Sequence, residues 1–357
     1  MKIAILGGGH GGYAAAADLS ETGHEVRLWR RDAAALAVLQ QAGAITLTDG
    51  RGNREVPIAL ASADIGDVLR GAELIVLPTP ATAQLDIAQA MAPHLQAGQV
   101  VFLAPGTFGS YVMAQAVRAA GQRAAVTWAE TGTLPYLARK HGPREVNVTV
   151  RAVRLPTGVY PARDAGRALE VIRRAYPSVH GCGDALSGAL MNAGPIIHPP
   201  LMVMNAAPLQ HFEKWDIHTE GTQPSVRAVT DRLDAERIAL RTALGYGAPH
   251  YPLADHYRND QWMYGDAHKK LQKSGDWREH IELHTHRYIV EDTELGLAFL
   301  ASVARWAGVD APIAQGLLAI VGGFLGRDLR RGARTLEGLN LAGLSRAELQ
   351  QRLHEGD

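Results

Sequence analysis

Hydrophobic and polar positions along the first half of the chain repeat with two different periods. Short apolar runs predict buried strands at 2–6, 24–29, 44–48, 74–77, 100–103 and 125–128. Alanine-rich or amphipathic stretches between several of these runs predict helices, as at 13–19 and 33–42. Strands that alternate with helices at this spacing are typical of a parallel sheet that is covered on both faces.

The pattern changes further along the chain. TDGRGN at 48–53 predicts a turn that joins two strands as an insertion in this plan, and 145–160 is rich in β-forming residues. An amphipathic helix is predicted at 163–176. Helical runs then dominate, at 185–207, 224–244, 293–307 and 311–325. We therefore expect an α/β domain with a parallel sheet over 1–183, followed by an all-α domain over 184–357.

The loop GGGHGG at 7–12 follows the first predicted strand and opens the first helix. Gly7, Gly9 and Gly12 satisfy G-x-G-x-x-G. In this motif one glycine makes the tight turn, the next admits a pyrophosphate and the third lets helix and strand pack closely. A phosphate at the helix N-terminus meets free N–H groups and a favourable dipole. Because a second strand follows at the expected distance, the loop predicts a Rossmann-type dinucleotide site rather than a structural turn.

The end of the second strand indicates which dinucleotide is bound. NAD sites usually place Asp or Glu there to bind the ribose 2′-hydroxyl. This chain has Arg30 and Arg31, and Asp32 comes too late in the turn to reach the ribose. A guanidinium pairs with the 2′-phosphate that a carboxylate would repel, so NADP is favoured over NAD. The alternative is a solvated strand end in an NAD site that lacks the usual acid. Pro78 and 105–107, at the ends of later strands, are expected to line the nicotinamide site, and the alternative for each is a simple turn.

Composition and charge narrow the function classes. Lys+Arg and Asp+Glu balance at 36 each, so no net positive field would attract nucleic acid or an anionic membrane. The single cysteine, Cys182, excludes an internal disulfide and fits a reducing compartment. No apolar run approaches the roughly 18 residues of a membrane span, and the first residues lack a signal-peptide pattern. We therefore expect a cytoplasmic protein whose partners are small molecules.

Two clusters of ionisable residues stand out in the helical half. His198 lies in an apolar helical run before Pro199 and Pro200, which predicts a kink at this position. A core histidine with satisfied hydrogen bonds is the alternative to a functional one. In the second cluster, Arg287 is suited to binding a carboxylate and Asp292 to orienting an imidazole. The alternative is that both are ordinary charges at a helix start.

One pair of histidines raises the question of a metal ion. His284 and His286 have the spacing of neighbours on one face of a strand. Two histidines without a third ligand at a recognisable spacing do not indicate zinc, so we expect no metal.

Taken together, the motifs resemble the opine dehydrogenase family. The resemblance spans nearly the whole chain, and its motifs are GGGHGG at 7–12, ETGTL at 130–134, N-x5-HP at 192–199, EGTQPSV at 220–226, DAERI at 234–238, RYIVED at 287–292 and RTLExL at 334–339. Many dehydrogenases share the glycine loop, but N-x5-HP followed by R-Y-x-x-E-D is much more specific.

The resemblance implies a fold, a reaction and site residues. The fold is a Rossmann domain followed by a helical domain. In the reaction, the amine of an L-amino acid and a 2-oxo acid such as pyruvate form an imine, which NAD(P)H reduces to an N-(1-carboxyalkyl) amino acid. By position, His198 is the acid/base catalyst, Asp292 its carboxylate partner and Arg287 the ligand of a substrate carboxylate. Asn192 and Thr131 orient nicotinamide or substrate. The amino-acid specificity and the oligomeric state stay open, a homodimer being one alternative.

Two other interpretations remain at this point. Ketopantoate reductases and glycerol-3-phosphate dehydrogenases have the same two-domain plan, but they rely on a catalytic lysine in the helical domain. The segment 184–240 offers only Lys214, in no matching context. A dinucleotide-sensing module without turnover is the other alternative, and it would have no need of His198, Arg287 and Asp292.

Overall fold

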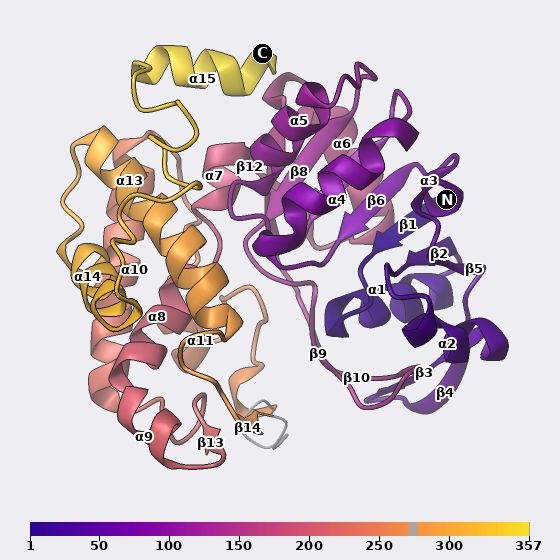
Figure 1. Ribbon diagram of the computed structural model, residues 1–357, viewed down its shortest axis with the longest axis horizontal. Helices are drawn as coiled ribbons and strands as arrows, with labels where there is room; N and C mark the ends of the chain where they lie inside the picture. Colours follow the sequence, from indigo (N-terminus) through magenta and orange to yellow (C-terminus); the bar gives the residue numbers. More distant parts are fainter. Residues whose placement is uncertain (271–276, 357) are drawn as a thin grey trace. The chain divides into compact units, whose positions relative to one another are not determined.

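The computed structural model describes residues 1–270 and 277–356 (Figure 1). The chain forms two compact units. The first is Met1–Ala189 with the last described residues from Leu353 onward, and the second is Leu190–Arg352. The division expected at 183/184 falls at the end of strand β12 (Val179–Asp184), shortly before the boundary between the units. No helix in the described ranges is long and apolar enough to cross a membrane.

The first unit is built on a mostly parallel sheet. Its strands are β1 (Lys2–Leu6), β2 (Glu25–Trp29), β5 (Leu60–Ser62), β6 (Leu74–Leu77), β7 (Val100–Leu103), β8 (Thr127–Thr131), β11 (Leu155–Tyr160) and β12. Among the described residues the sheet has eight strands in the order β12-β11-β8-β7-β6-β1-β2-β5. Neighbouring strands are parallel except β8 and β11. The predicted parallel sheet is therefore confirmed, with its last two strands running opposite to the rest.

Strand β8 begins later than the apolar run at 125–128 predicts. Its pairing with β7 starts at Thr127 and continues through Glu130. The polar end of the strand is fully buried because the Glu130 carboxylate has hydrogen-bond partners inside the protein. Hydropathy alone therefore misplaces this strand end, which lies next to the loop after β7.

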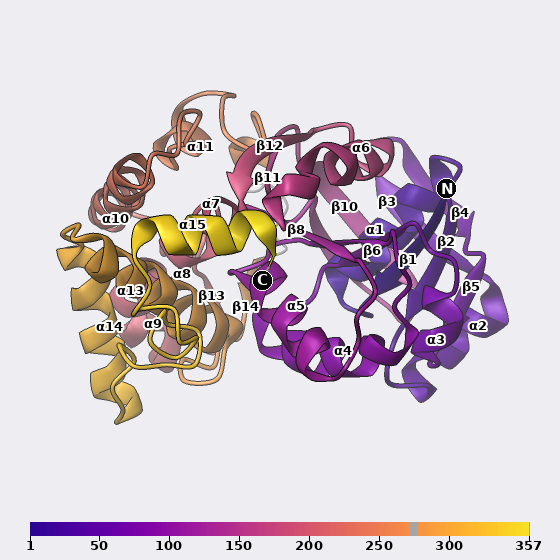
Figure 2. The ribbon, with the colours of Figure 1, turned by 90° about the horizontal axis from the view of Figure 1, so that it is seen from above.

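Helices cover both faces of this sheet (Figure 2). Three neighbouring helices lie on one face, namely α3 (Ile65–Leu69), α4 (Gln84–Met91) and α5 (Gly109–Ala119), and α6 (Ala165–Ala175) lies on the other. Helix α1 (His10–Glu21) contacts strands of this sheet and of a second, smaller one. Its alanines at 14–17 are fully buried, since small side chains allow backbone to approach a helix from two sides.

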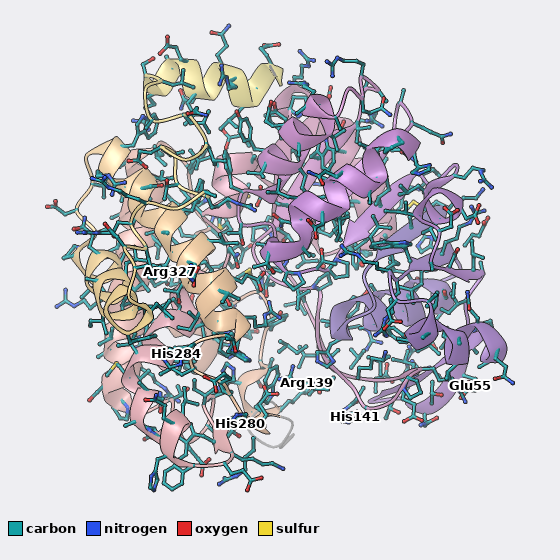
Figure 3. The ribbon with its side chains drawn as sticks, in the orientation of Figure 1. Glu55, Arg139, His141, His280, His284 and Arg327 are labelled. Carbon is teal, nitrogen blue, oxygen red and sulfur yellow. The ribbon has the colours of Figure 1, made fainter. Side chains whose placement is uncertain are left out.

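The second sheet combines segments that are far apart in sequence. It consists of β3 (Ala44–Asp49), β4 (Gly52–Pro57), β9 (Tyr136–Lys140) and β10 (Glu145–Arg151), in the order β4-β3-β10-β9. The β3–β4 hairpin confirms the predicted turn at 48–53. Strand β9 was not predicted, and the parallel β3–β10 pairing joins the hairpin to the β-rich segment. Figure 3 labels Glu55 and Arg139 on the two edge strands.

Ion pairs tie α1 to the second sheet. The Asp49 side chain is 2% exposed, and its carboxylate lies 2.8 Å from Nη1 of Arg54 and 2.7 Å from Nη2 of Arg151. Arg151 also donates to Asp18 of α1 at 2.7 Å, and Arg54 donates to Glu21 of the same helix. These guanidinium groups hold the pKa of Asp49 well below its usual range. The hairpin is thus fixed to the helix that carries the glycine loop.

The end of the chain belongs to the first unit through polar contacts of helix α15 (Arg346–Glu355). Arg163 donates to Glu355 at 2.9 Å, and Arg118 of α5 donates to the carbonyl of Gly356. These contacts explain why the last described residues group with the sheet rather than with the helices that precede them.

The second unit is helical. Its elements are α8 (Gly194–Met204), α9 (Ala206–His211), α10 (Pro224–Ala243), α11 (Ala254–Arg258), a π-helical segment η5 (Tyr288–Leu297), α13 (Ala298–Ala307) and α14 (Pro312–Leu325). The predicted helical runs are confirmed, although 185–207 is split. Within the described ranges, a short ribbon of β13 (Trp215–Asp216) and β14 (Arg278–Glu279) departs from the all-α expectation. Helix α8 continues through its two internal prolines to Met204.

The DAERI motif organises this unit. Glu236 of α10 accepts hydrogen bonds from the backbone N–H groups of Ile313 (2.7 Å) and Ala314 (3.0 Å), which caps the first turn of α14. Arg237 donates to the carbonyl of Leu190 at 3.2 Å and so holds the segment that leads into α8. The contacts of both side chains are structural.

We expect Asp49→Asn to destabilise the protein by about 3 kcal/mol, because it leaves two guanidinium groups without their buried anion. Asp67→Asn is the matched control, since the exposed Asp67–Arg70 pair should contribute less than about 1 kcal/mol. Chemical denaturation at pH 7 measures both. Because the pKa of Asp49 is lowered in the folded state, its stabilisation is present above pH ~4 and lost as the pH falls further. Equal midpoints for Asp49→Asn and the wild type at pH 7 would contradict this role.

Candidate active site

The glycine loop of the first unit has the backbone geometry of a phosphate cradle. Gly7 has φ of +137°, and a Cβ atom at Gly12 would lie 1.8 Å from the carbonyl oxygen of Gly7. A side chain is therefore excluded at Gly12, while Gly7 has a conformation that favours glycine. Gly9 caps α1 without any side-chain hydrogen bond. Because Gly9 has no side chain that could cap the helix, a pyrophosphate can approach this turn closely, and the loop fits a dinucleotide.

Arg30 lies over this loop. A Cβ atom at Gly8 would be 2.4 Å from Cδ of Arg30, so the glycine makes room for the arginine stem. Asp32, 3.9 Å from the Arg30 guanidinium, accepts the backbone N–H of Ala35 at 3.0 Å. Arg31 is largely exposed and lies 3.6 Å from Asp86. The structure therefore brings Arg30, but not Arg31, into contact with the glycine loop.

The loops after β6 and β7 also have defined positions. A Cβ atom at Gly11 would lie 3.1 Å from Cβ of Pro78, which places Pro78 against the start of α1. The loop at 105–107 leads into Phe108, which has φ of +61° and whose N–H donates to buried Glu130 at 2.7 Å. Glu130 also accepts hydrogen bonds from Ser110. Sequence reasoning assigned Glu130 no role of its own, yet its carboxylate fixes this loop.

Thr131 is fully buried next to Glu130. Its hydroxyl donates to the carbonyl of Pro156 at 2.9 Å, across the β8–β11 pair. This hydrogen bond holds two strands of the main sheet together. The structure thus gives Thr131 a structural contact, and its role toward nicotinamide or substrate stays a prediction.

In the second unit, two glycines let α8 and η5 approach closely. A Cβ atom at Gly194 would lie 2.2 Å from Oδ1 of Asp292, and one at Gly296 would lie 2.3 Å from Cγ of Pro195. Asn192 is buried, and its Oδ1 accepts the N–H of Gly194 at 3.0 Å. Asn192 therefore shapes the start of α8, at the point where Asp292 contacts that helix.

This packing brings His198 and Asp292 together from positions that are far apart in sequence. Nδ1 of His198 lies 2.8 Å from Oδ2 of Asp292. Burial lowers the pKa of His198 well below its ordinary value, and the nearby Arg287 charge lowers it further. Burial raises the pKa of Asp292 to about 7 against the opposing effect of Arg287. The pair is therefore able to take up and release a proton near neutral pH through the other imidazole nitrogen, Nε2.

Tyr288 and His218 extend this arrangement. The Tyr288 ring stacks on His198 with centroids 3.6 Å apart and an interplanar angle of 10°. Its hydroxyl lies 2.9 Å from Nε2 of His218, whose ring meets His198 edge-on at 5.9 Å. Tyr288 therefore restricts rotation of the His198 imidazole. Neither residue was singled out from the sequence, although Tyr288 lies inside the RYIVED motif.

Arg287 is half exposed and paired with Glu291. Its Nε and Nη2 lie 3.1 and 3.0 Å from Oε2 of Glu291, which is itself buried. One edge of the guanidinium is thus held by the protein. In the described part of the chain no protein group bonds Nη1, so this nitrogen is available to a ligand carboxylate.

The two histidines considered for a metal do not alternate along a strand. β14 ends at Glu279, and the N–H of His286 bonds the Glu282 carbonyl at 2.9 Å, which makes the segment around His284 a turn (Figure 3). The predicted strand geometry was wrong because a turn leads directly into η5. No group of three or more His, Cys, Asp or Glu in 1–270 and 277–356 has the geometry of a metal site.

Both halves of the chain match models of known protein families. Residues 181–325 match the family model of the NAD/NADP octopine/nopaline dehydrogenase α-helical domain. Residues 2–110 match the model of the NAD-dependent glycerol-3-phosphate dehydrogenase N-terminus. The chain is 30% identical to an opine dehydrogenase of Arthrobacter sp. (strain 1C) over 356 residues, which covers 97% of each protein.

Solved structures show the same fold. Octopine dehydrogenase with NADH and L-arginine aligns with a TM-score of 0.69 at 19% identity, covering 97% of this chain and 98% of that one. NADP+-bound yersinopine dehydrogenase aligns with a TM-score of 0.64 at 16% identity, covering 99% and 98%. The helical-domain model separates the chain from the glycerol-3-phosphate dehydrogenases, whose model covers only part of the first unit. The chain therefore belongs to the opine dehydrogenase family and is an NAD(P)-dependent oxidoreductase that acts on CH–NH donors.

Proposed function

We propose that this enzyme joins the amine of an L-amino acid to a 2-oxo acid, such as pyruvate, and reduces the imine to an N-(1-carboxyalkyl) amino acid, and that it also runs the reverse reaction. The His198–Asp292 pair carries the proposal, because imine formation and hydrolysis need a group that both gives and takes protons at neutral pH. The full-length similarity to the Arthrobacter opine dehydrogenase supports the substrate class.

The proton steps are assigned to His198. Condensation releases water from the 2-oxo carbon as the C=N bond forms, and protonated Nε2 supplies the proton that the leaving hydroxyl needs. The dinucleotide, when bound, supplies the hydride that reduces the imine carbon. Asp292 holds Nδ1 and compensates the imidazolium charge, while the Tyr288 stack keeps the ring in one orientation. In the oxidative direction the neutral imidazole takes the proton from the attacking water.

Substrate carboxylates are assigned to Arg287. Its Nε edge is occupied by buried Glu291, which orients the guanidinium and leaves Nη1 and part of Nη2 for a ligand. We assign Asn192 and Thr131 supporting roles in orienting substrate or nicotinamide. Asn192 shares the start of α8 with the His198–Asp292 pair, which supports its assignment more directly than that of Thr131.

For the cofactor we propose a preference for NADP over NAD. Gly7, Gly9 and Gly12 would hold the pyrophosphate, with Pro78 against the start of the same helix. Arg30 lies over the loop where NAD sites usually carry an acid, and the carboxylate of Asp32 is already bonded to a backbone N–H. Arg31 is assigned a secondary role at the outer edge of the site. A cytoplasmic location and a homodimer are further proposals, the second testable by light scattering.

We expect His198→Ala to lower kcat by about 10²- to 10⁴-fold, because it removes the acid/base group without touching the glycine loop. NADPH consumption with pyruvate and a panel of amino acids measures the effect. His354→Ala is the control, since that side chain is exposed near the end of the chain. Undiminished turnover by His198→Ala would remove His198 from the mechanism.

The pH dependence should follow the His198–Asp292 pair. With the pKa of Asp292 raised to about 7, kcat/KM for imine reduction falls above neutral pH as the pair loses its proton, and opine oxidation rises over the same range. In Asp292→Asn only the imidazole titrates, and burial lowers the pKa of that imidazole. The fall in imine reduction and the rise in opine oxidation should therefore both move to lower pH. The substrate amine titrates identically with both enzymes, so the difference between the profiles reports the pair. Superimposable profiles would contradict the assignment.

We expect Arg30→Asp to reduce the ratio of NADPH to NADH affinity by about 10- to 100-fold, because a carboxylate would face the 2′-phosphate. Arg70→Asp, an exposed charge reversal on the same unit, should leave the ratio unchanged. Fluorescence titration with each reduced dinucleotide measures both. If the ratio is unaltered in Arg30→Asp, the NADP preference does not depend on Arg30.

A further inference from the structure

A second cation, Lys140, lies beside the glycine loop. It is the last residue of β9, the edge strand of the smaller sheet, and its backbone N–H donates to Nδ1 of His10 at 2.9 Å. His10 is part of GGGHGG, so this hydrogen bond fixes the end of β9 against the loop. The ammonium group of Lys140 lies 3.7 Å from the centroid of the Tyr13 ring, in the first turns of α1. This cation–π contact places the charge beside the loop.

Lys140 and Arg30 gather positive charge at one place. Burial and the Arg30 charge together lower the pKa of Lys140 to about 8, which shows that the two cations are close enough to repel. Throughout the described ranges no carboxylate forms an ion pair with Lys140, whereas Asp32 lies 3.9 Å from the Arg30 guanidinium and also accepts the backbone N–H of Ala35. Asp32 therefore offsets at most the charge of Arg30, and the charge of Lys140 is left for a ligand to balance.

A buried polar atom lies in the same cluster. The hydroxyl of Tyr13 is fully buried and has no hydrogen-bond partner among the described residues. Burial raises the pKa of Tyr13, while the Arg30 guanidinium opposes that rise through hydrogen bonding to the phenol and through its charge. The guanidinium therefore approaches the hydroxyl of Tyr13 without forming a hydrogen bond of good geometry. Tyr13 therefore contacts both cations, with Arg30 near its hydroxyl and Lys140 over the face of its ring.

We infer that Lys140 is a second ligand of the 2′-phosphate of NADP, acting with Arg30 from the other side of the Tyr13 ring. A phosphate dianion needs more than one cation for neutralisation, and a lysine on a fixed strand supplies the second charge without further ordering of a loop. The inference rests on the proposed NADP preference. It also gives the smaller sheet a function, since β9 carries the lysine to the dinucleotide site.

Binding of the adenosine fragments tests this directly, with 2′,5′-ADP and 5′-AMP titrated calorimetrically. We expect Lys140→Met, which keeps the stem over Tyr13, to weaken 2′,5′-ADP at least tenfold and to leave 5′-AMP within twofold. Lys140→Arg should recover most of the loss, and Lys214→Met, an exposed lysine of the second unit, should have no effect. Unchanged 5′-AMP affinity also shows that the Lys140→Met variant is folded.

The outcomes separate the two proposals. If the wild type binds 2′,5′-ADP no more tightly than 5′-AMP, the NADP preference fails and Lys140 loses its ligand. If the wild type prefers 2′,5′-ADP and Arg30→Asp abolishes that preference while Lys140→Met does not, only the inference about Lys140 fails. Equal weakening of both fragments by Lys140→Met would place the ammonium at the 5′-phosphate instead and overturn the inference.

A pH titration provides an independent readout. Because the pKa of Lys140 is about 8 without ligand, wild-type affinity for 2′,5′-ADP should fall up to tenfold per pH unit above pH 8, as binding must then restore the proton. The affinity for 5′-AMP should not show this fall. Lys140→Met should remove the dependence, and its persistence in that variant would assign it to another group.

Discussion

The chemistry proposed for the second unit depends on one hydrogen bond, between Nδ1 of His198 and Oδ2 of Asp292. The bond forms only because α8 and η5 approach within a distance that no side chain at Gly194 or Gly296 would permit. The close approach also buries both groups, and burial brings the proton affinity of the pair near neutrality. The close packing of α8 against η5 therefore determines both the position of the two side chains and their pKa values. The backbone of η5 is π-helical and presents Tyr288 and Asp292 to the same imidazole. π-Helical segments are rare in proteins, and those that occur often lie at functional sites.

The first unit uses charge in two contrasting ways. Its buried carboxylates are fully engaged within the protein, as Asp49 binds two guanidinium groups and Glu130 binds the loop after β7. At the glycine loop cations are in excess, because Arg30 and Lys140 lie near α1 while Asp32 forms an ion pair with Arg30 alone. Carboxylates that are paired with guanidinium groups stabilise the fold, whereas a local excess of positive charge favours the binding of an anion. The smaller sheet takes part in both, since it contributes Asp49 to the scaffold and Lys140 to the loop.

Local patterns predicted much of this arrangement. Apolar runs and glycines located β1, α1 and the dinucleotide loop, because strand burial and a tight turn leave a signature within a few residues. The hairpin at 48–53 was equally local. Strand β9 and its sheet were missed, since pairing of β3 with β10 joins segments about a hundred residues apart. The predicted end of β8 was wrong because Glu130 is charged, which argues against a buried strand. The hydrogen-bond partners that allow its burial become neighbours only in the folded chain.

The two-part plan, the glycine loop and the family of the chain could all be recognised from the sequence. Each of these features depends on residue types and their spacing within a continuous stretch of the chain. Only the folded chain shows that Asp292 bonds His198, that Tyr288 stacks on the same ring, that Glu291 holds one edge of Arg287, and that the ammonium group of Lys140 lies over Tyr13. Those contacts depend on distances of a few ångströms between residues that are remote in sequence. Burial of the contacting groups then shifts the pKa values of His198 and Asp292. No local pattern encodes either quantity, because both arise from what the rest of the chain packs around them.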